Sequence, residues 1–169
     1  MPDRKTLRRV EQDKREGKSA STQAGEFIRE EIHHVREGKH GARSPQQAIA
    51  IGLSKARRAG IEVKPPAEGE TSESTRRKAE RDYERGHGEG SSRRTSARRS
   101  AAASRALKRE PRGSASQRSL SGQAHRAAAR RSSAERSAAA QQASRTKGST
   151  ERSAAARKAA RTRARRRRG

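Results

Sequence analysis

The stretch GARSPQQAIAIGLSKARRAGIEVKPP, residues 41–66, contains the clearest helix signals in the chain. Ser44 suits the N-cap, Pro45 suits the first helical position, and Gln47 completes a Ser-x-x-Gln capping box. Gly60 suits the left-handed residue that follows a helix. Together these signals predict a helix over about 45–59.

Small residues line one face of this predicted helix. Ala48, Gly52 and Ala56 recur every four residues, beside Ile49 and Leu53. Residues four apart share a helix face, so this stripe would let a second helix approach closely.

The partner helix is predicted just upstream, over about 22–37. Apolar residues there follow the i, i+3, i+4 spacing of one helix face, and Gly38 follows them. Ordering each residue costs about 1–2 kcal/mol, so the few apolar residues of this region make a marginal core. We therefore expect either a loose hairpin or a homodimer formed through the apolar faces. The residues expected to pack these helices are Phe27, Ile28, Ile32, Val35, Ile49 and Leu53.

Charge is distributed unequally along the 169 residues, which carry a formal net charge of +25. Residues 1–63 hold 14 basic and 9 acidic residues, and we expect a small helical module there. Residues 64–89 hold 6 basic and 7 acidic residues and are typical of a mixed-charge linker. Residues 90–169 hold 24 basic and 3 acidic residues and form an Arg/Ala/Ser-rich basic tail.

The tail is expected to be largely disordered, because its large apolar residues are limited to Leu107 and Leu120. Alanine and arginine favour helix, but serines and glycines interrupt the sequence and the arginines repel one another. Transient helix is expected over 124–143 and 151–165. The predicted fold class is therefore mostly α: a short helical hairpin, about 22–37 and 45–59, followed by a long, largely disordered basic tail with transient helix.

The excess of basic residues predicts a polyanionic partner, since contact with phosphates releases condensed counterions. Residues 90–169 contain no Phe, Tyr or Trp to stack on single-stranded bases. They also lack the apolar face of an interfacial helix, so no membrane partner is expected. These features favour duplex DNA, bound through its phosphate backbone without sequence preference, over RNA. The predicted contacts are Arg93, Arg94, Arg98, Arg99, Arg130, Arg131, Arg157, Lys158, Arg161, Arg163, Arg165, Arg166, Arg167 and Arg168.

Residues 29–40, REEIHHVREGKH, form the one constellation that suggests chemistry. Glu30-x-x-His33, Glu31-x-x-His34 and Glu37-x-x-His40 resemble the carboxylate–imidazole spacing of metal sites. A solvated helix face has the same pattern, and no second element is predicted to exclude water. The sequence also has no P-loop, no GxGxxG and no GxSxG. We therefore expect no metal, no cofactor and no enzymatic activity.

Residues 21–60, with the Gln-Ala-Ile-Ala-Ile run at 47–51, resemble a family of small basic bacterial proteins with an uncharacterised domain. The likeness covers roughly residues 1–65, and the remainder is similar in composition to the Arg/Ala tails of bacterial histone-like proteins. Members carry loose labels such as DNA-binding or plasmid stabilisation. The resemblance implies a bacterial, nucleoid-associated protein of the cytoplasm, and it implies no catalytic or binding residues.

The leading interpretation is a non-enzymatic, histone-like protein that binds DNA through its arginine-rich tail. One alternative is an RNA- or ribosome-associated basic protein. Another is an adaptor whose helical hairpin recognises a protein partner, while the tail only localises it.

Overall fold

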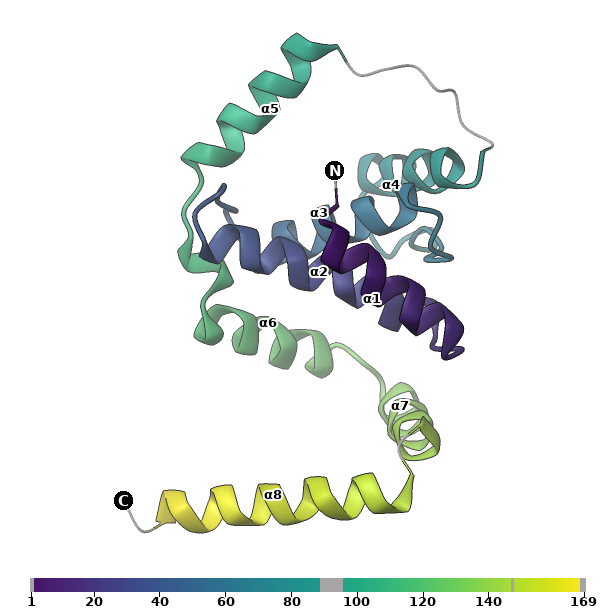
Figure 1. The fold of residues 1–169 in the computed structure, drawn as a ribbon, viewed down its shortest axis with the longest axis vertical. Helices are drawn as coiled ribbons and strands as arrows, with labels where there is room; N and C mark the ends of the chain where they lie inside the picture. Colours follow the sequence, from purple (N-terminus) through teal and green to yellow (C-terminus); the bar gives the residue numbers. More distant parts are fainter. Residues whose placement is uncertain (1, 89–95, 147, 168–169) are drawn as a thin grey trace. The chain divides into compact units, whose positions relative to one another are not determined.

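The computed structural model describes residues 2–88, 96–146 and 148–167, and most of these residues are helical (Figure 1). The chain divides into two compact units, Met1–Gln123 and Ala124–Gly169. None of the helices within these described ranges is long and apolar enough to cross a membrane. The elements are α1 (Arg4–Arg15), α2 (Ala20–Arg36), α3 (Pro45–Arg58), α4 (Glu73–Gly86), α5 (Ala97–Arg109), the 3-10 helix η1 (Gly113–Ala115), α6 (Gln117–Ala129), α7 (Ser133–Thr146) and α8 (Ser149–Arg167).

The ends of α3 follow from the capping residues in its sequence. Ser44 Oγ accepts a hydrogen bond from the backbone N–H of Gln47 at 3.2 Å. The Gln47 side chain reaches back to the N–H of Arg43, one residue before the N-cap. At the other end Gly60 has a φ of 77°, and the N–H of Ile61 donates to the Ala56 carbonyl. This is a Schellman stop, so the predicted start and end signals of α3 are confirmed.

The first unit is built on the close contact between α2 and α3, the most extensive of its helix pairs. A Cβ atom added to Gly52 would lie 2.7 Å from Cα of Ile28 on α2. Ala48 and Ala56, one turn before and after Gly52, are fully buried. The predicted close approach along the small-residue stripe is therefore confirmed.

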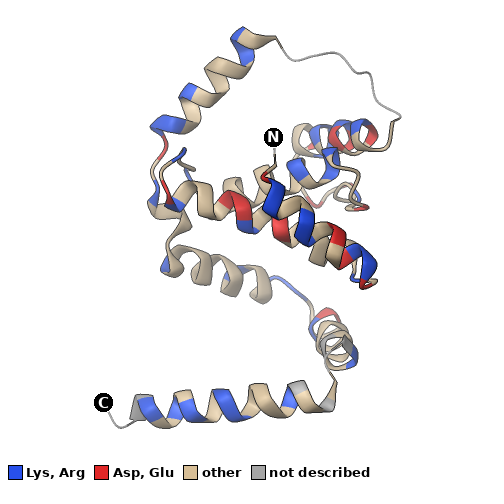
Figure 2. Ribbon diagram, viewed as in Figure 1, with Lys and Arg blue, Asp and Glu red and all other residues tan. Residues whose placement is uncertain are grey.

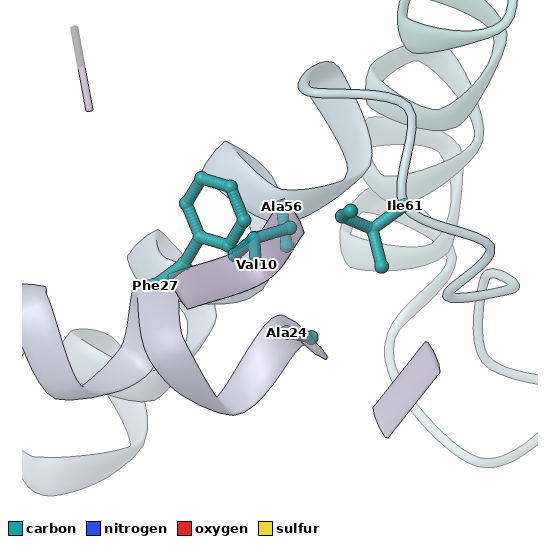
Figure 3. Packing of buried hydrophobic residues seen from close by; sticks show 5 residues of the cluster. All are labelled: Val10, Ala24, Phe27, Ala56 and Ile61. Atoms are coloured by element: carbon teal, nitrogen blue, oxygen red, sulfur yellow. The ribbon is translucent and has the colours of Figure 1, made fainter. Parts of the chain in front are cut away.

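Two small hydrophobic clusters surround this contact. The first joins α1, α2, α3 and the segment after α3, as Figure 3 shows, through Val10, Ala24, Phe27, Ala56 and Ile61. The second lies at the opposite end of α2 and contains Val35, Ala42, Ala48 and Ala115. Since Ala115 belongs to η1, the basic part of the chain contributes to the core of the first unit.

Residues 64–89, expected as a linker, contain α4, which packs against α3 and buries Ala79. The contact is close, because a Cβ atom on Gly86 would lie 1.9 Å from the carbonyl oxygen of Arg57. This segment is therefore part of the first unit.

The segment between α5 and η1 docks on the loop that follows α2. Backbone N–H groups of Gly41 and Ala42 donate to the carbonyls of Leu107 and Pro111 at 2.8 and 3.1 Å. A Cβ atom on Gly41 would lie only 1.7 Å from the carbonyl oxygen of Glu110. Residues far apart in the sequence are therefore joined by backbone contacts that only glycine at position 41 allows.

The predicted fold class, a short hairpin followed by a largely disordered tail, is wrong, because residues 97–167 form four further α-helices within the described ranges. The serines that were expected to interrupt helices instead begin them. Ser96, Ser116 and Ser132 each accept the N–H three residues later, at 3.2–3.3 Å. Such N-caps contribute about 0.5–2 kcal/mol each. The transient helix expected over 124–143 is divided at residues 130–132, and α8 extends beyond the expected 151–165.

The fit of Gly52 against α2 gives a first prediction. Gly52→Ala should lower the free energy of unfolding by about 1–3 kcal/mol, because the added methyl group meets backbone and not a flexible side chain. Gly25→Ala, in α2, is the matched control, since nothing lies within 4 Å of its Cβ position. That change should raise stability by up to about 1 kcal/mol. Chemical denaturation measures both, and equal effects of the two variants would contradict the close approach.

The helical state of α8 gives a second prediction. Ala155→Pro should lower the helical signal in far-ultraviolet circular dichroism, because proline inside a helix costs about 3 kcal/mol or more. Ala155 is exposed, so the melting of the first unit should not change. Ala155→Ser is the control and should retain most of the signal. An unchanged spectrum for the proline variant would mean that residues 149–167 are not helical in the free chain.

Candidate nucleic-acid interface

Half of the predicted phosphate contacts lie on α8. Its 19 residues make a helix about 28 Å long. Arg157, Arg161 and Arg165 recur every four residues and so lie on one face, while Lys158 and Arg163 lie on other faces. These five side chains are exposed. Figure 2 shows basic residues along most of α8.

The remaining predicted contacts are distributed over both units. Arg98 and Arg99 are exposed in the first turn of α5. Arg130 and Arg131 are exposed between α6 and α7. Arg166 and Arg167 belong to the last turn of α8, and Arg93, Arg94 and Arg168 lie outside the described residues. The described contacts therefore belong to two helices, α5 and α8, and to the connection between α6 and α7.

The first 87 residues pair many of their charges with one another, whereas the later helices do not. Every ion pair between side chains that the structure describes lies within residues 3–87. Figure 2 shows the same contrast: α1 and α4 carry both blue and red residues, whereas α5 and α8 show blue residues among tan ones and no red. The described Lys and Arg side chains after residue 96 therefore make no described ion pair with a carboxylate.

Glu135 is an acidic residue that could have neutralised part of this charge, but it is engaged elsewhere. It accepts a hydrogen bond from the backbone N–H of Ser132 at 2.7 Å, and its own N–H donates to Ser132 Oγ. These two contacts with Ser132 lower the pKa of Glu135. The carboxylate thus completes the cap of α7, and no described arginine is paired with it.

Further exposed cations were not among the predicted contacts. On α5, Arg105 and Arg109 follow Arg98 by seven and eleven residues and so share its face. On α8, Arg152 donates to the carbonyl of Ser144 and makes no described ion pair. The Ser96 N-cap could have revealed these residues of α5, because it marks the start of the helix on which Arg98, Arg105 and Arg109 share a face.

The residues predicted to pack the hairpin divide into two groups. Phe27 and Val35 are fully buried, one in each hydrophobic cluster. Ile28, Ile32, Ile49 and Leu53 are partly exposed. Ile49 and Leu53 also line a surface pocket of about 530 Å³ beside α4. The homodimer that was expected to form through the apolar faces of these helices stays a prediction.

The carboxylate–imidazole residues that suggested a metal site are divided between the interior and the surface, where His33 and Glu37 are exposed. Glu30 and Glu31 of α2 are buried, and Lys55 of α3 lies against both. His34 of α2 and His40 of the following loop offer ligand atoms within 4.8 Å of Glu31 and of each other. His33 is exposed and outside this group. Helix α3, which carries Lys55, is therefore the second element that shields Glu30 and Glu31 from water, and the sequence did not predict this shielding.

Comparison of the chain with protein-family models, with curated proteins and with solved structures found no match. The resemblance of residues 21–60 to a bacterial family therefore stays a prediction.

Proposed function

We propose that this chain is a non-enzymatic DNA-binding protein that holds the phosphate backbone of duplex DNA without sequence preference. The observation that carries this proposal is α8, a helix of 19 residues with exposed basic side chains on several faces and no described ion pair. Such a helix concentrates positive charge along a rigid rod, and contact with phosphates would release counterions.

The shape of α8 favours duplex DNA over duplex RNA. The major groove of B-form DNA is about 12 Å wide and admits an α-helix, whereas that of A-form RNA is deep and narrow. Basic residues on different sides of one helix can reach the phosphates of both groove walls. Ala154, Ala155 and Ala156, between the cations, cannot hydrogen-bond to a base edge. This composition supports backbone binding without base readout.

The uncompensated cations of α5 and of residues 130–131 would supply additional phosphate contacts. The resemblance of residues 21–60 to a bacterial family supports a site of action on the nucleoid, in the cytoplasm. In this role the protein would resemble histone-like proteins in using arginine and alanine, with helices in place of a disordered tail.

The dependence of affinity on salt tests the proposal in the full-length chain. Each phosphate contact on duplex DNA contributes about 0.9 to the slope of log affinity against log salt. Replacing Arg157, Arg161 and Arg165 by Gln should therefore lower the magnitude of this slope by about 2.7. Fluorescence anisotropy with a labelled duplex, over a series of salt concentrations, measures the slope.

The matched control removes the same charge from the first unit. Arg4, Arg8 and Arg15 are exposed on α1 and take part in no described ion pair. Replacing these three by Gln should leave the slope nearly unchanged. Equal slopes for the two triple variants would mean that the salt dependence follows net charge alone, and they would contradict a specific role for α8. Tighter binding of a structured RNA at the same salt would favour the RNA-binding alternative.

A further inference from the structure

Glu31 is a carboxylate buried in the first unit with an unusual set of neighbours. It is 1% exposed, and Nζ of Lys55 lies 2.7 Å from Oε2 while Nε2 of His40 lies 3.0 Å from Oε1. Neither oxygen of Glu31 accepts a hydrogen bond of acceptable direction from a described donor. Lys55 is therefore an ion-pair partner of Oε2, whereas Oε1 faces only the imidazole of His40 and could bind a second cation.

The neighbouring Glu30 shows the contrast. It accepts hydrogen bonds from the backbone N–H of Asp3 at 2.9 Å and from Nζ of Lys55 at 3.1 Å. Burial works against its ionisation, but these contacts outweigh burial and lower the pKa of Glu30. Glu30 therefore needs no further cation.

Charge balance around Lys55 also leaves room for a cation. Its ammonium group lies 2.7 Å from Oε2 of Glu31 and 3.1 Å from Oε1 of Glu30, so it is shared between two carboxylates. Asp3 adds a third carboxylate, 3.3 Å from Nε2 of His34. Three carboxylates thus surround one ammonium group and the imidazoles of His34 and His40.

The ring of His40 is oriented in the manner of a metal ligand. Its Nδ1 contacts the carbonyl oxygen of Gly41 at 3.0 Å. A carbonyl can only accept, so Nδ1 carries a proton and Nε2 of the neutral ring presents a lone pair. A lone pair 3.0 Å from a carboxylate oxygen repels it unless a cation binds both. A proton on Nε2 would not be aligned with Glu31 Oε1, because that oxygen accepts no hydrogen bond.

The distances suit a small transition-metal ion. Two ligands bound to tetrahedral Zn²⁺ at about 2.0–2.2 Å lie roughly 3.3 Å apart, close to the separation of His40 Nε2 and Glu31 Oε1. One ligand atom from each of Glu31, His34 and His40 lies within 4.8 Å of the others. His34 also lines a surface pocket of about 730 Å³, which provides access from solvent.

We propose that Glu31, His34 and His40 form a binding site for a divalent transition-metal ion, with Zn²⁺ the best match to two imidazoles and one carboxylate. The site joins α2 to the loop of His40, the residue before Gly41. Gly41 and Ala42 hold the segment between α5 and η1 by backbone hydrogen bonds. Metal binding therefore stabilises the docking of this segment, independently of any DNA contact.

Titration of the full-length chain with zinc sulfate by isothermal calorimetry tests the site. We expect one equivalent of Zn²⁺ to bind and the melting temperature to rise. His34→Gln and His40→Gln should each weaken binding more than about tenfold. His33→Gln is the matched control, because His33 is exposed and adjacent to His34 but outside the group, and it should bind as the original chain does.

A second measurement does not depend on whether the variants fold. The original chain loaded with Co²⁺ should show the visible absorption bands of a tetrahedral site with nitrogen and oxygen ligands. Absence of stoichiometric metal binding and of these bands would overturn the proposal, and would leave a protonated His40 as the partner of Glu31. Equal loss of affinity in His33→Gln, or full affinity in both His34→Gln and His40→Gln, would also overturn it.

Discussion

The close approach of α2 and α3 at Gly52 is the constraint on which the first unit depends. Because no side chain separates the helices there, the backbone of Ile28 lies directly over Gly52. The same approach brings Ala48 and Ala56 into the two hydrophobic clusters and sets Lys55 of α3 against Glu30 and Glu31 of α2. A core of small residues thus places a buried group of charges that a core of large side chains would have held apart.

Local signals were sufficient to predict the helix that carries this contact. Ser44 and Pro45 act within the first turn of α3, and Gly60 acts just beyond its last turn, so the effect of these residues does not depend on the rest of the fold. The four-residue repeat of small side chains indicated the contact face for the same reason. Capping residues and a regular spacing of small side chains can therefore be recognised in a single sequence.

The prediction of disorder failed for a reason that is also local. Serine inside a helix competes for backbone hydrogen bonds, whereas serine at the first position satisfies them. The tail contains both kinds, and Ser132 with Glu135 is a capping box that identifies the start of α7. Repulsion between arginines four residues apart amounts to only about 0.2–0.5 kcal/mol per pair, which the helix propensity of alanine and arginine can offset.

Other features could not be predicted, because they join distant parts of the chain. The guanidinium of Arg36 donates to the carbonyl of Ala115, 79 residues away, and His40 meets Glu31 only because the loop after α2 folds back. The predicted arginine contacts are a different case: their exposure follows from composition, but their division among several helices follows from the caps. Sequence therefore indicated the exposure of these arginines better than their arrangement on helices.

The absence of a side chain at Gly41 has an evolutionary consequence. Any heritable substitution at this codon would push the carbonyl of Glu110 away and detach the segment around η1, while the contact between α2 and α3 at Gly52 would be untouched. Natural selection could in this way release this segment from the N-terminal helices by one mutation. Descendants would retain the folded N-terminal helices and carry the arginine-rich region on a freely moving tether.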